Sequence, residues 1–473
     1  MRKTKIICTL GPATDKEGIM EAMIREGMDV ARFNFSHGTH EEQKKRLEKL
    51  KTLRRQFDRP IAALLDTKGP EIRLGCFKDH KISLEEGQKF TLVNDETEGT
   101  QEQVTISYKN LYKDVKPGDS ILIDDGLVGM EVVEILNKDI VCIVNNGGDI
   151  SDHKGVNVPG VELKMPFISP KDREDLLFGI EEDFDLVAAS FTRTADDVNE
   201  MRELLNSNGG KDIHIIAKIE NQQGVDNIDS IIEAADGIMI ARGDMGVEIP
   251  LEHVPIIQQR IIEKVYEAGK VVITATQMLD SMMIHPRPTR AETTDVANAI
   301  YQGTSAIMLS GETAAGKYPV EALKMMVKIA AHMENNIDYN GIFRRRERCE
   351  DPDITNAISH ATCMTAIDLK ANAILAVSKT GNTARMISKY RPDCLIVGCS
   401  SSEKVCRQLN LSWGILPLQI REEYSSEILC LRAIEAAQNH GVVEEGDKIV
   451  FTGGIPLGIP GRTNLIRVCI VGE

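Results

Sequence analysis

An alternation of short apolar runs with longer segments of helical period constrains the fold of this chain more than any other feature. The apolar runs that alternate in this way lie at residues 5–10, 28–34, 61–66, 185–190, 213–218, 237–241, 270–275 and 305–309. Near-continuous apolar strands joined by helices are typical of a parallel sheet that is buried on both faces. Eight such units predict a closed (β/α)8 barrel; an open, doubly wound sheet, which usually has fewer repeats, is the alternative.

The alternation is interrupted between residues 71 and 167, where the pattern is β only. The strand-like runs lie at residues 89–93, 103–107, 120–124, 130–134 and 140–144. Turn residues such as Asp124-Asp125-Gly126 separate them, and that triplet is typical of a hairpin. We therefore expect an inserted β domain.

A charged stretch at residues 344–351, within a change of pattern from about 340 to 353, predicts a linker to a third domain. After it, helical segments near residues 355–369, 383–391, 402–409 and 425–439 alternate with strands at 373–377, 395–397, 448–451 and 466–470. The expected domains are the barrel (residues 1–70 and 168–340), the inserted β domain (71–167) and a C-terminal α/β domain (341–473).

Two helix starts carry local signals. Thr14 and Glu17 have capping-box spacing ahead of an apolar run, and Ser169 precedes Pro170 as an N-cap precedes a proline at the first helical position. We expect a helix to begin at each.

Charge and cysteine content narrow the classes of function. The formal net charge of −16 repels phosphate polymers, so nucleic acid is not an expected partner. The ten cysteines lack metal-ligand spacing, and neither a secretory signal nor an apolar run of membrane-spanning length is visible. These features predict a cytoplasmic protein.

Polar side chains gather where the predicted barrel strands end, which is where barrel enzymes carry their active sites. In the second strand, period-two alternation places Arg32, Asn34 and Ser36 on one face. The strand ends of this kind are residues 32–37, 66–73, 218–221, 242–246, 274–277 and 310–313. One charged residue at a strand end is usually a cap or an ion pair, but so many together indicate a functional site.

The residue types favour phosphoryl transfer. Glu220 and Asp244 are carboxylates from successive strands and could hold Mg²⁺ together with waters and substrate oxygens. Arg32, Arg73 and Lys218 could surround a transferring phosphoryl group, whose catalysis is mainly positioning and charge stabilisation. The sequence contains neither a P-loop nor the protein-kinase motifs.

Nine segments together resemble the pyruvate kinase family, in order and over essentially the whole chain. They are residues 5–12 (KIICTLGP), 28–38 (MDVARFNFSHG), 65–73 (LDTKGPEIR), 154–160 (KGVNVPG), 218–221 (KIEN), 241–248 (ARGDMGVE), 275–279 (ATQML), 288–292 (PTRAE) and 295–298 (DVAN). The resemblance implies a TIM barrel with an inserted β-barrel lid and a C-terminal α/β domain. It also implies a homotetramer that transfers a phosphoryl group from phosphoenolpyruvate to ADP, giving pyruvate and ATP in the last step of glycolysis. The chain ends at Glu473, so we expect a bacterial-type member without the extra C-terminal phosphohistidine-like domain.

The resemblance assigns metal sites. Glu220 and Asp244 are the expected ligands of Mg²⁺ or Mn²⁺. The expected potassium ligands are Asn34, Ser36, Asp66 and Thr67. Glu71 occupies a position where members that need potassium carry glutamate and members that do not need it carry lysine, so we expect potassium activation.

The resemblance also assigns substrate contacts. The expected substrate-binding residues are Arg32, Lys218, Arg242, Gly243, Asp244 and Thr276. The expected catalytic residues are Lys218, Arg32, Arg73 and Thr276, with Ser310 and Glu312 as candidate members of a proton relay. His37 and Lys154 are expected to contact ADP. The group that protonates the enolate stays open.

A second site is expected in the C-terminal domain, at Ser378-Lys379-Thr380-Gly381-Asn382-Thr383. Hydroxyl groups and backbone N–H groups at a helix start can bind phosphate, although a simple capped helix start has the same pattern. By resemblance this loop binds a phosphorylated effector, and the glycine-rich residues 452–463 would cover a second phosphate. Fructose 1,6-bisphosphate, AMP and a sugar monophosphate all stay open as effectors.

Two other functions compete with this interpretation. A metal-dependent barrel aldolase acting on pyruvate could use Lys218, Glu220 and residues 242–244, but it would need neither residues 66–69 nor a β lid. A catalytically inactive metabolite-binding relative is the other alternative, and the intact set of transferred residues argues against it.

Overall fold

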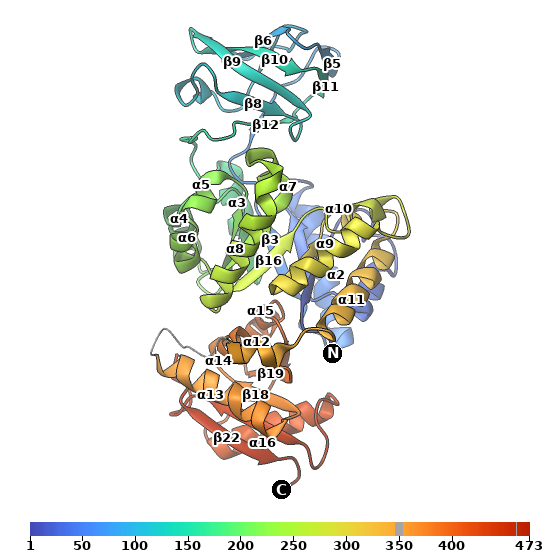
Figure 1. The fold of residues 1–473 in the computed structure, drawn as a ribbon, viewed down its shortest axis with the longest axis vertical. Helices are drawn as coiled ribbons and strands as arrows, with labels where there is room; N and C mark the ends of the chain where they lie inside the picture. Colours follow the sequence, from blue (N-terminus) through green and yellow to red (C-terminus); the bar gives the residue numbers. More distant parts are fainter. Residues whose placement is uncertain (346–352, 460) are drawn as a thin grey trace.

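The computed structural model describes residues 1–345, 353–459 and 461–473, which form three parts arranged along one axis. In Figure 1 a β-rich part lies at the top, a barrel surrounded by helices lies in the middle, and an α/β part lies at the bottom. Most of the predicted linker, residues 346–352, lies outside the described residues.

The middle part is a closed, all-parallel barrel of eight strands. In spatial order these are β1 (Lys5–Thr9), β17 (Ala306–Leu309), β16 (Val271–Ala275), β15 (Gly237–Ala241), β14 (His214–Ile219), β13 (Leu186–Ala189), β3 (Ala62–Asp66) and β2 (Val30–Asn34). Each coincides with a predicted run to within two residues at either end. The predicted barrel is confirmed, and the open doubly wound sheet is excluded.

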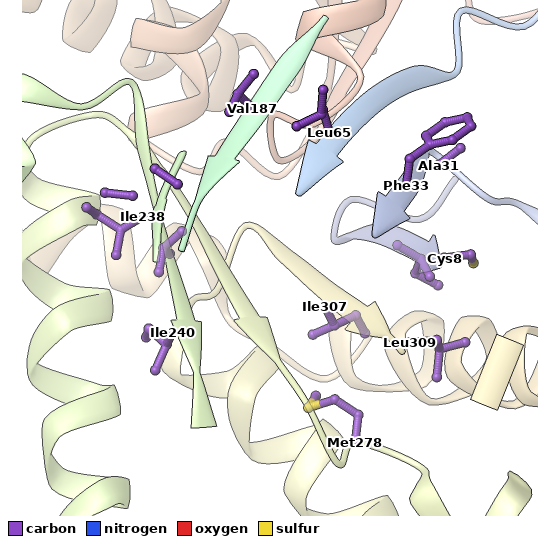
Figure 2. Close-up of a cluster of buried hydrophobic side chains, with 14 of the residues drawn as sticks. Cys8, Ala31, Phe33, Leu65, Val187, Ile238, Ile240, Met278, Ile307 and Leu309 are labelled. Carbon is purple, nitrogen blue, oxygen red and sulfur yellow. The ribbon is translucent and has the colours of Figure 1, made fainter. Parts of the chain in front are cut away.

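Side chains that alternate along these strands form two separate cores. Ile7, Leu64 and Met239 belong to a cluster to which all eight strands contribute, and this cluster fills the barrel interior. Their neighbours Cys8, Leu65 and Ile238 belong to a larger cluster, between the outside of the barrel and the helices (Figure 2). Because both faces of each strand are buried, the strands appear in the sequence as continuous apolar runs.

Helices surround the barrel and follow its strands in chain order. They are α1 (Ile19–Glu26), α2 (His40–Phe57), α3 (Pro170–Glu181), α4 (Ala195–Ser207), α5 (Gln222–Asp226), α6 (Ile228–Ala234), α7 (Arg242–Glu248), α8 (Val254–Glu267), α9 (Arg290–Gln302), α10 (Gly311–Ala314) and α11 (Pro319–Glu334), after which α12 (Tyr339–Arg345) leads away. Among the described residues, no helix is both long and apolar enough to cross a membrane.

One of the two predicted helix caps is confirmed and the other is wrong. Ser169 caps α3 in a capping box with Asp172, and Pro170 is the first helical residue. Thr14 does not cap α1, which begins after Gly18 in a left-handed conformation with φ of 76°. The Thr14 hydroxyl instead donates to the carbonyl oxygen of Gly11 (2.8 Å) and accepts from its N–H (2.9 Å), which closes a tight turn before the helix.

The part between β3 and α3 is a β domain, as expected. Its seven-stranded sheet has the order β4 (Ile72–Arg73), β12 (Gly155–Asn157), β8 (Ser120–Ile123), β9 (Val128–Leu136), β10 (Asp139–Asn146), β6 (Lys89–Val93) and β7 (Gln103–Thr105), and β5 (Lys81–Leu84) pairs with β11 (Gly148–Ser151). The sheet is open in its strand order, whereas a barrel was expected. An isolated bridge between Leu74 and Ile106 brings its two edges together, so the sheet is curled.

The C-terminal part is a five-stranded sheet with helices, as expected. The strand order is β20 (Ile415–Gln419), β19 (Leu395–Ser400), β18 (Ala373–Val377), β21 (Lys448–Gly453) and β22 (Leu465–Ile470), with β22 antiparallel to β21. The helices are α13 (Ile354–Leu369), α14 (Asn382–Lys389), α15 (Glu403–Leu409) and α16 (Ser426–Asn439). The sequence analysis missed β20, which contains Pro417. An edge strand tolerates a proline, because the missing N–H group removes no hydrogen bond that the sheet needs.

Candidate active site

Four of the predicted side chains meet at the carboxyl ends of β2, β3 and β14. The Lys218 ammonium (Nζ) lies 3.0 Å from Oε1 of Glu220 and 3.2 Å from Oδ1 of Asp66. The other oxygen of Asp66, Oδ2, lies 2.5 Å from Nε of Arg32. We call these four residues (Arg32, Asp66, Lys218 and Glu220) the inner cluster. It is a continuous chain of buried ion pairs, built from segments that are far apart in the sequence.

The alternation predicted for the second strand places Arg32 in this cluster. Arg32 and Asn34 are half-buried, while Phe33 and Phe35 are buried in the outer core. The Arg32 guanidinium also donates to the hydroxyl of Thr9 on β1 (3.0 Å), so contacts from two strands fix its direction.

A residue that the sequence analysis did not single out completes the cluster. The hydroxyl of Ser190, which directly follows β13, accepts a hydrogen bond from Nζ of Lys218 at 2.7 Å. The neighbouring backbone N–H of Phe191 donates to Oε2 of Glu220 at 2.5 Å. The only sequence signal for Ser190 is its position at the end of a barrel strand.

Burial and mutual charge set the protonation of the inner cluster. Burial alone would raise the pKa of Asp66, but the charges of Arg32 and Lys218 hold that pKa below its usual value. Burial would lower the pKa of Lys218, but Asp66 and Glu220 together hold it above the usual value. Lys218 is therefore a fixed positive charge at neutral pH.

Glu220 lacks full compensation for its negative charge. Burial raises its pKa to about 8, against the lowering effect of Lys218, and the charge of Asp244 adds to the rise. Although Nζ of Lys218 is 3.0 Å away, Oε1 of Glu220 is completely buried and accepts no well-aligned hydrogen bond from any residue that the structure describes. A divalent cation at this oxygen would supply both the missing partner and the missing charge, so these carboxylates fit such an ion.

The metal ligands available from the protein are few. Within the part of the chain that the structure describes, no three His, Cys, Asp or Glu side chains are grouped so that they could hold a metal ion. Glu220 and Asp244, the latter in the first turn of α7, would therefore need waters and substrate oxygens to complete the coordination, as is common for Mg²⁺.

The predicted potassium ligands also lie together. Asn34 and Asp66 are register partners on the neighbouring strands β2 and β3, and Oδ1 of Asn34 accepts from the N–H of Ser36 (3.1 Å). Both oxygens of Asp66 contact cationic side chains, but a carboxylate has about four acceptor positions and can still take a further ligand. Asp66 is the one charged member of this set, and a set of oxygen ligands with a single negative charge suits a monovalent cation.

The segments that follow β15 and β16 contact each other at Thr276. The N–H of Gly243 donates to the Thr276 hydroxyl at 2.7 Å, and the Arg242 guanidinium is held by both oxygens of Asp295, each at 2.7 Å. Thr276 has a φ of 70° and Gln277 a φ of 54°, which is unusual for residues other than glycine. Backbone strain of this kind concentrates at functional sites.

A cleft of about 490 Å³ separates the inserted β domain from the barrel, and Glu71, Arg73, Lys154 and Asp244 are among its lining residues. Nε of Arg73 lies 2.7 Å from Oε2 of Glu71, and Nζ of Lys154 lies 2.8 Å from Oδ1 of Asp124. The predicted residues thus fall into four groups: the inner cluster, the other potassium ligands beside it, the contact between Thr276 and residues 242–243, and the cleft. Asp244 lines the cleft and also interacts electrostatically with Glu220 and Lys218.

Three predicted active-site residues, His37, Ser310 and Glu312, lie apart from these groups. His37 is exposed beyond β2 and is not among the described residues that line the cleft. The Glu312 carboxylate accepts from the backbone N–H groups of Ser310 (2.7 Å) and Leu279 (3.0 Å), and burial raises its pKa. Glu312 therefore joins the segments that contain Leu279 and Ser310. The buried hydroxyl of Ser310 has no hydrogen-bond partner in the described structure.

The predicted effector loop lines a cavity of about 90 Å³ in the C-terminal part, at the opposite end of the molecule from the lid (Figure 1). Ser378 and Thr383 on the loop face Arg462 and Thr463 from the glycine-rich segment, and the hydroxyls of Thr383 and Thr463 are 2.8 Å apart. Nζ of Lys379 lies 3.3 Å from Oε1 of Glu422, so the two side chains form an ion pair. The two segments predicted to bind an effector thus share one cavity.

Comparisons with known proteins agree along the chain. Residues 1–323 match the family model for the pyruvate kinase barrel domain, and residues 356–469 match the model for the pyruvate kinase alpha/beta domain. The chain is 50% identical over 472 residues to the pyruvate kinase of Clostridium acetobutylicum, covering all of both chains. It is likewise 50% identical over 471 residues to that of Clostridium perfringens, covering 99% of each. The crystal structure of a pyruvate kinase from Cryptosporidium parvum matches with a TM-score of 0.94 and 38% identity, covering 99% of this chain and 96% of that one. This chain belongs to the pyruvate kinase family.

Proposed function

We propose that this phosphotransferase moves a phosphoryl group from phosphoenolpyruvate to ADP at the inner cluster, giving pyruvate and ATP in the last step of glycolysis. The observation that carries the proposal is the buried ammonium of Lys218, held between the carboxylates of Asp66 and Glu220. A fixed positive charge at this place would stabilise both the migrating phosphoryl group and the enolate that forms as it leaves. One such contact at about 4 Å contributes about 4 kcal/mol at an effective dielectric constant near 20.

The other groups of the site would orient the substrate. Arg32, which Asp66 and Thr9 hold in place, would bind the phosphate, and Arg73 would assist transfer from the cleft. The backbone of Arg242, Gly243 and Asp244 and the hydroxyl of Thr276 would bind the substrate carboxylate. Thr276 would also lie near the carbon that gains a proton; no proton donor is assigned.

Two kinds of cation would support this chemistry. Glu220 and Asp244 would hold Mg²⁺ or Mn²⁺, which when bound offsets the negative charge of the substrate phosphate and carboxylate. Potassium would be held by Asn34, Ser36, Asp66 and Thr67. The presence of Glu71 instead of lysine supports the potassium requirement.

ADP would enter the cleft between lid and barrel, where Lys154 is carried by the lid, and it would also contact His37 on the barrel, which lies outside the cleft lining. Closure of the lid would exclude water and so prevent hydrolysis of the phosphoryl group. The domain boundaries that go with this motion are residues 1–70 with 168–340 for the barrel, 71–167 for the lid and 341–473 for the C-terminal domain.

The C-terminal cavity would bind a phosphorylated metabolite as an allosteric effector, through residues 378–383. A small cavity lined by hydroxyls, glycine backbone and the side chains of Lys379 and Arg462 supports a phosphate ligand. We further propose that the protein is a cytoplasmic homotetramer; the support for the homotetramer is membership of the family alone.

A coupled assay tests the function directly. Phosphoenolpyruvate, ADP and Mg²⁺ are supplied, and pyruvate is detected by lactate dehydrogenase through the oxidation of NADH. We expect pyruvate formation that depends on ADP. A barrel aldolase or an inactive metabolite-binding relative would form none; the family match over the whole chain argues against the aldolase, and the intact inner cluster argues against the inactive relative.

A further inference from the structure

Ser190 occupies a central position that no role assigned so far explains. Its side chain lies between the Lys218 ammonium and the carbonyl group of Thr67, and only 1% of the residue is exposed to solvent. It thus touches both the residue proposed to stabilise the phosphoryl group and a residue of the proposed potassium site.

The chemistry of the partners fixes the direction of the hydrogen bonds. An ammonium group can only donate, so the Ser190 hydroxyl accepts from Lys218, at 2.7 Å. A carbonyl oxygen can only accept, so the single hydroxyl proton is donated to Thr67, at 2.6 Å; Oδ1 of Asp66, at 3.2 Å, is the alternative acceptor. A charged donor at one end strengthens such a chain, because each bond polarises the next.

We propose that Ser190 is a positioning residue, which orients the ammonium of Lys218 and couples it to the monovalent-cation ligands Asp66 and Thr67. This inference rests on the proposed function. The ammonium has three protons, and its three neighbours are Asp66, Glu220 and Ser190. A cation at Asp66 and Thr67 acts on the same oxygens that accept the Ser190 proton. It therefore influences Lys218 through the Ser190 hydroxyl, in addition to the direct contact between Asp66 and Lys218.

The hydroxyl is not needed to hold the two strand ends together. The N–H of Thr67 donates to the carbonyl of Ala188 (3.1 Å), and the N–H of Ser190 donates to the Thr67 hydroxyl (3.1 Å). These bonds join the ends of β3 and β13 without the Ser190 side chain. Loss of that side chain oxygen therefore removes the contact with Lys218 and leaves the strand connection in place.

The test compares Ser190→Ala with the wild type in potassium and in tetramethylammonium buffers. We expect kcat in potassium to fall at least tenfold while KM for phosphoenolpyruvate changes less than threefold. The ratio of the rates in the two buffers should also fall at least fivefold. A second measurement needs no turnover: the rise in melting temperature that potassium causes, through binding to the folded state, should be at most half as large in the variant. Ser190→Cys, whose thiol is a weaker hydrogen-bonding group, should give intermediate values.

Thr192→Val provides the matched control. Thr192 is equally buried on the same loop, but within the described residues its hydroxyl bonds only to the carbonyl of Ala189, at 2.8 Å. This variant should keep the potassium response of the wild type. The inference is overturned if Ser190→Ala keeps kcat and the potassium response within twofold of the wild type. It is also overturned if kcat and the potassium response fall as much in Thr192→Val as in Ser190→Ala. A wild type that forms no ADP-dependent pyruvate would contradict the proposed function instead, and the melting measurement would still test the coupling.

Discussion

Nε of Arg407 on α15 lies 2.7 Å from Oδ1 of Asp185, which joins the C-terminal domain to the amino end of barrel strand β13. The same carboxylate accepts from Arg54 of α2 (3.2 Å) and from the N–H of Ala63 (2.8 Å), and its side chain is fully buried. One carboxylate thus connects the barrel wall, a barrel helix and the domain that contains the proposed effector cavity.

Replacement of Asp185 by asparagine should destabilise the protein strongly. The change removes the buried counter-charge of two mostly buried guanidinium groups, although Arg407 still pairs with the exposed Asp183. Removing one partner of a buried ion pair costs about 3 kcal/mol or more. Thermal melting should show a clear drop. Asp183→Asn is the control, because Asp183 also pairs with Arg407 but is 58% exposed, so its loss should cost at most about 1 kcal/mol. An equal drop in melting temperature in the two variants would show that the burial of the carboxylate does not determine how much its ion pair stabilises the protein.

Replacement of Lys218 by methionine should lower turnover at least about 100-fold, as loss of a main charge-stabilising donor does. The measurement is kcat in the lactate dehydrogenase-coupled assay at saturating substrates. Lys211→Met, at an exposed lysine after α4, should leave turnover unchanged. Near-normal turnover of Lys218→Met would remove Lys218 from its proposed role.

The barrel was predictable from sequence because burial on both faces leaves an unambiguous pattern in each strand. The β15 strand, for example, coincides with its predicted run, residues 237–241. The curled sheet of the lid was less predictable from the sequence. Its β4 and β12 strands have two and three residues, which is too short for any periodicity to show. The edge strand β20 was hidden by Pro417, because proline usually argues against a strand.

Most members of the candidate site were visible as polar residues at strand ends, but their partners were not. The sequence indicates that Lys218 and Glu220 share a face of one strand, but not that Asp66 and Ser190 complete the surroundings of the ammonium. That contact depends on the closure of the barrel, which brings β3, β13 and β14 side by side. Residues 242–246 were taken as a strand end, whereas α7 begins there directly. This places Asp244 in the first turn of a helix.

Replacement of Glu71 by lysine should remove the need for potassium. In the structure Glu71 pairs with Arg73 at 2.7 Å, within the cleft. A lysine would bring a positive charge covalently, in place of the one that the free cation supplies. We expect the wild type to be much slower in tetramethylammonium than in potassium, and Glu71→Lys to have nearly equal rates in both.

Glu71→Gln separates the gain of a positive charge from the loss of a negative one, since it removes the carboxylate and adds no cation. Its activity should still depend on potassium. If the wild type is equally active in both buffers, the potassium requirement is contradicted for this chain.

The buried lysine of β1 predicts a pH dependence of stability. Burial lowers the pKa of Lys5 to about 8 from an ordinary value of 10.5, and its ammonium donates to the carbonyl of Ile415 in the C-terminal domain at 2.6 Å. Between pH 8 and 10.5 the unfolded chain binds more protons at this residue than the folded one, so stability from Lys5 rises with pH across that window. Below pH 8 both states are protonated, and the cost of burying the charge is fully present.

The size of the effect follows from the difference between the two pKa values, which corresponds to about 3 kcal/mol over the whole window. Lys5→Met cannot titrate, so thermal melts at several pH values should show the wild type gaining stability relative to this variant as pH rises from 8 toward 10.5. Lys16→Met, at an exposed lysine before α1, should follow the wild type throughout. A constant difference between wild type and Lys5→Met across that range would mean that Lys5 keeps its proton in the folded protein, and that burial does not govern its charge.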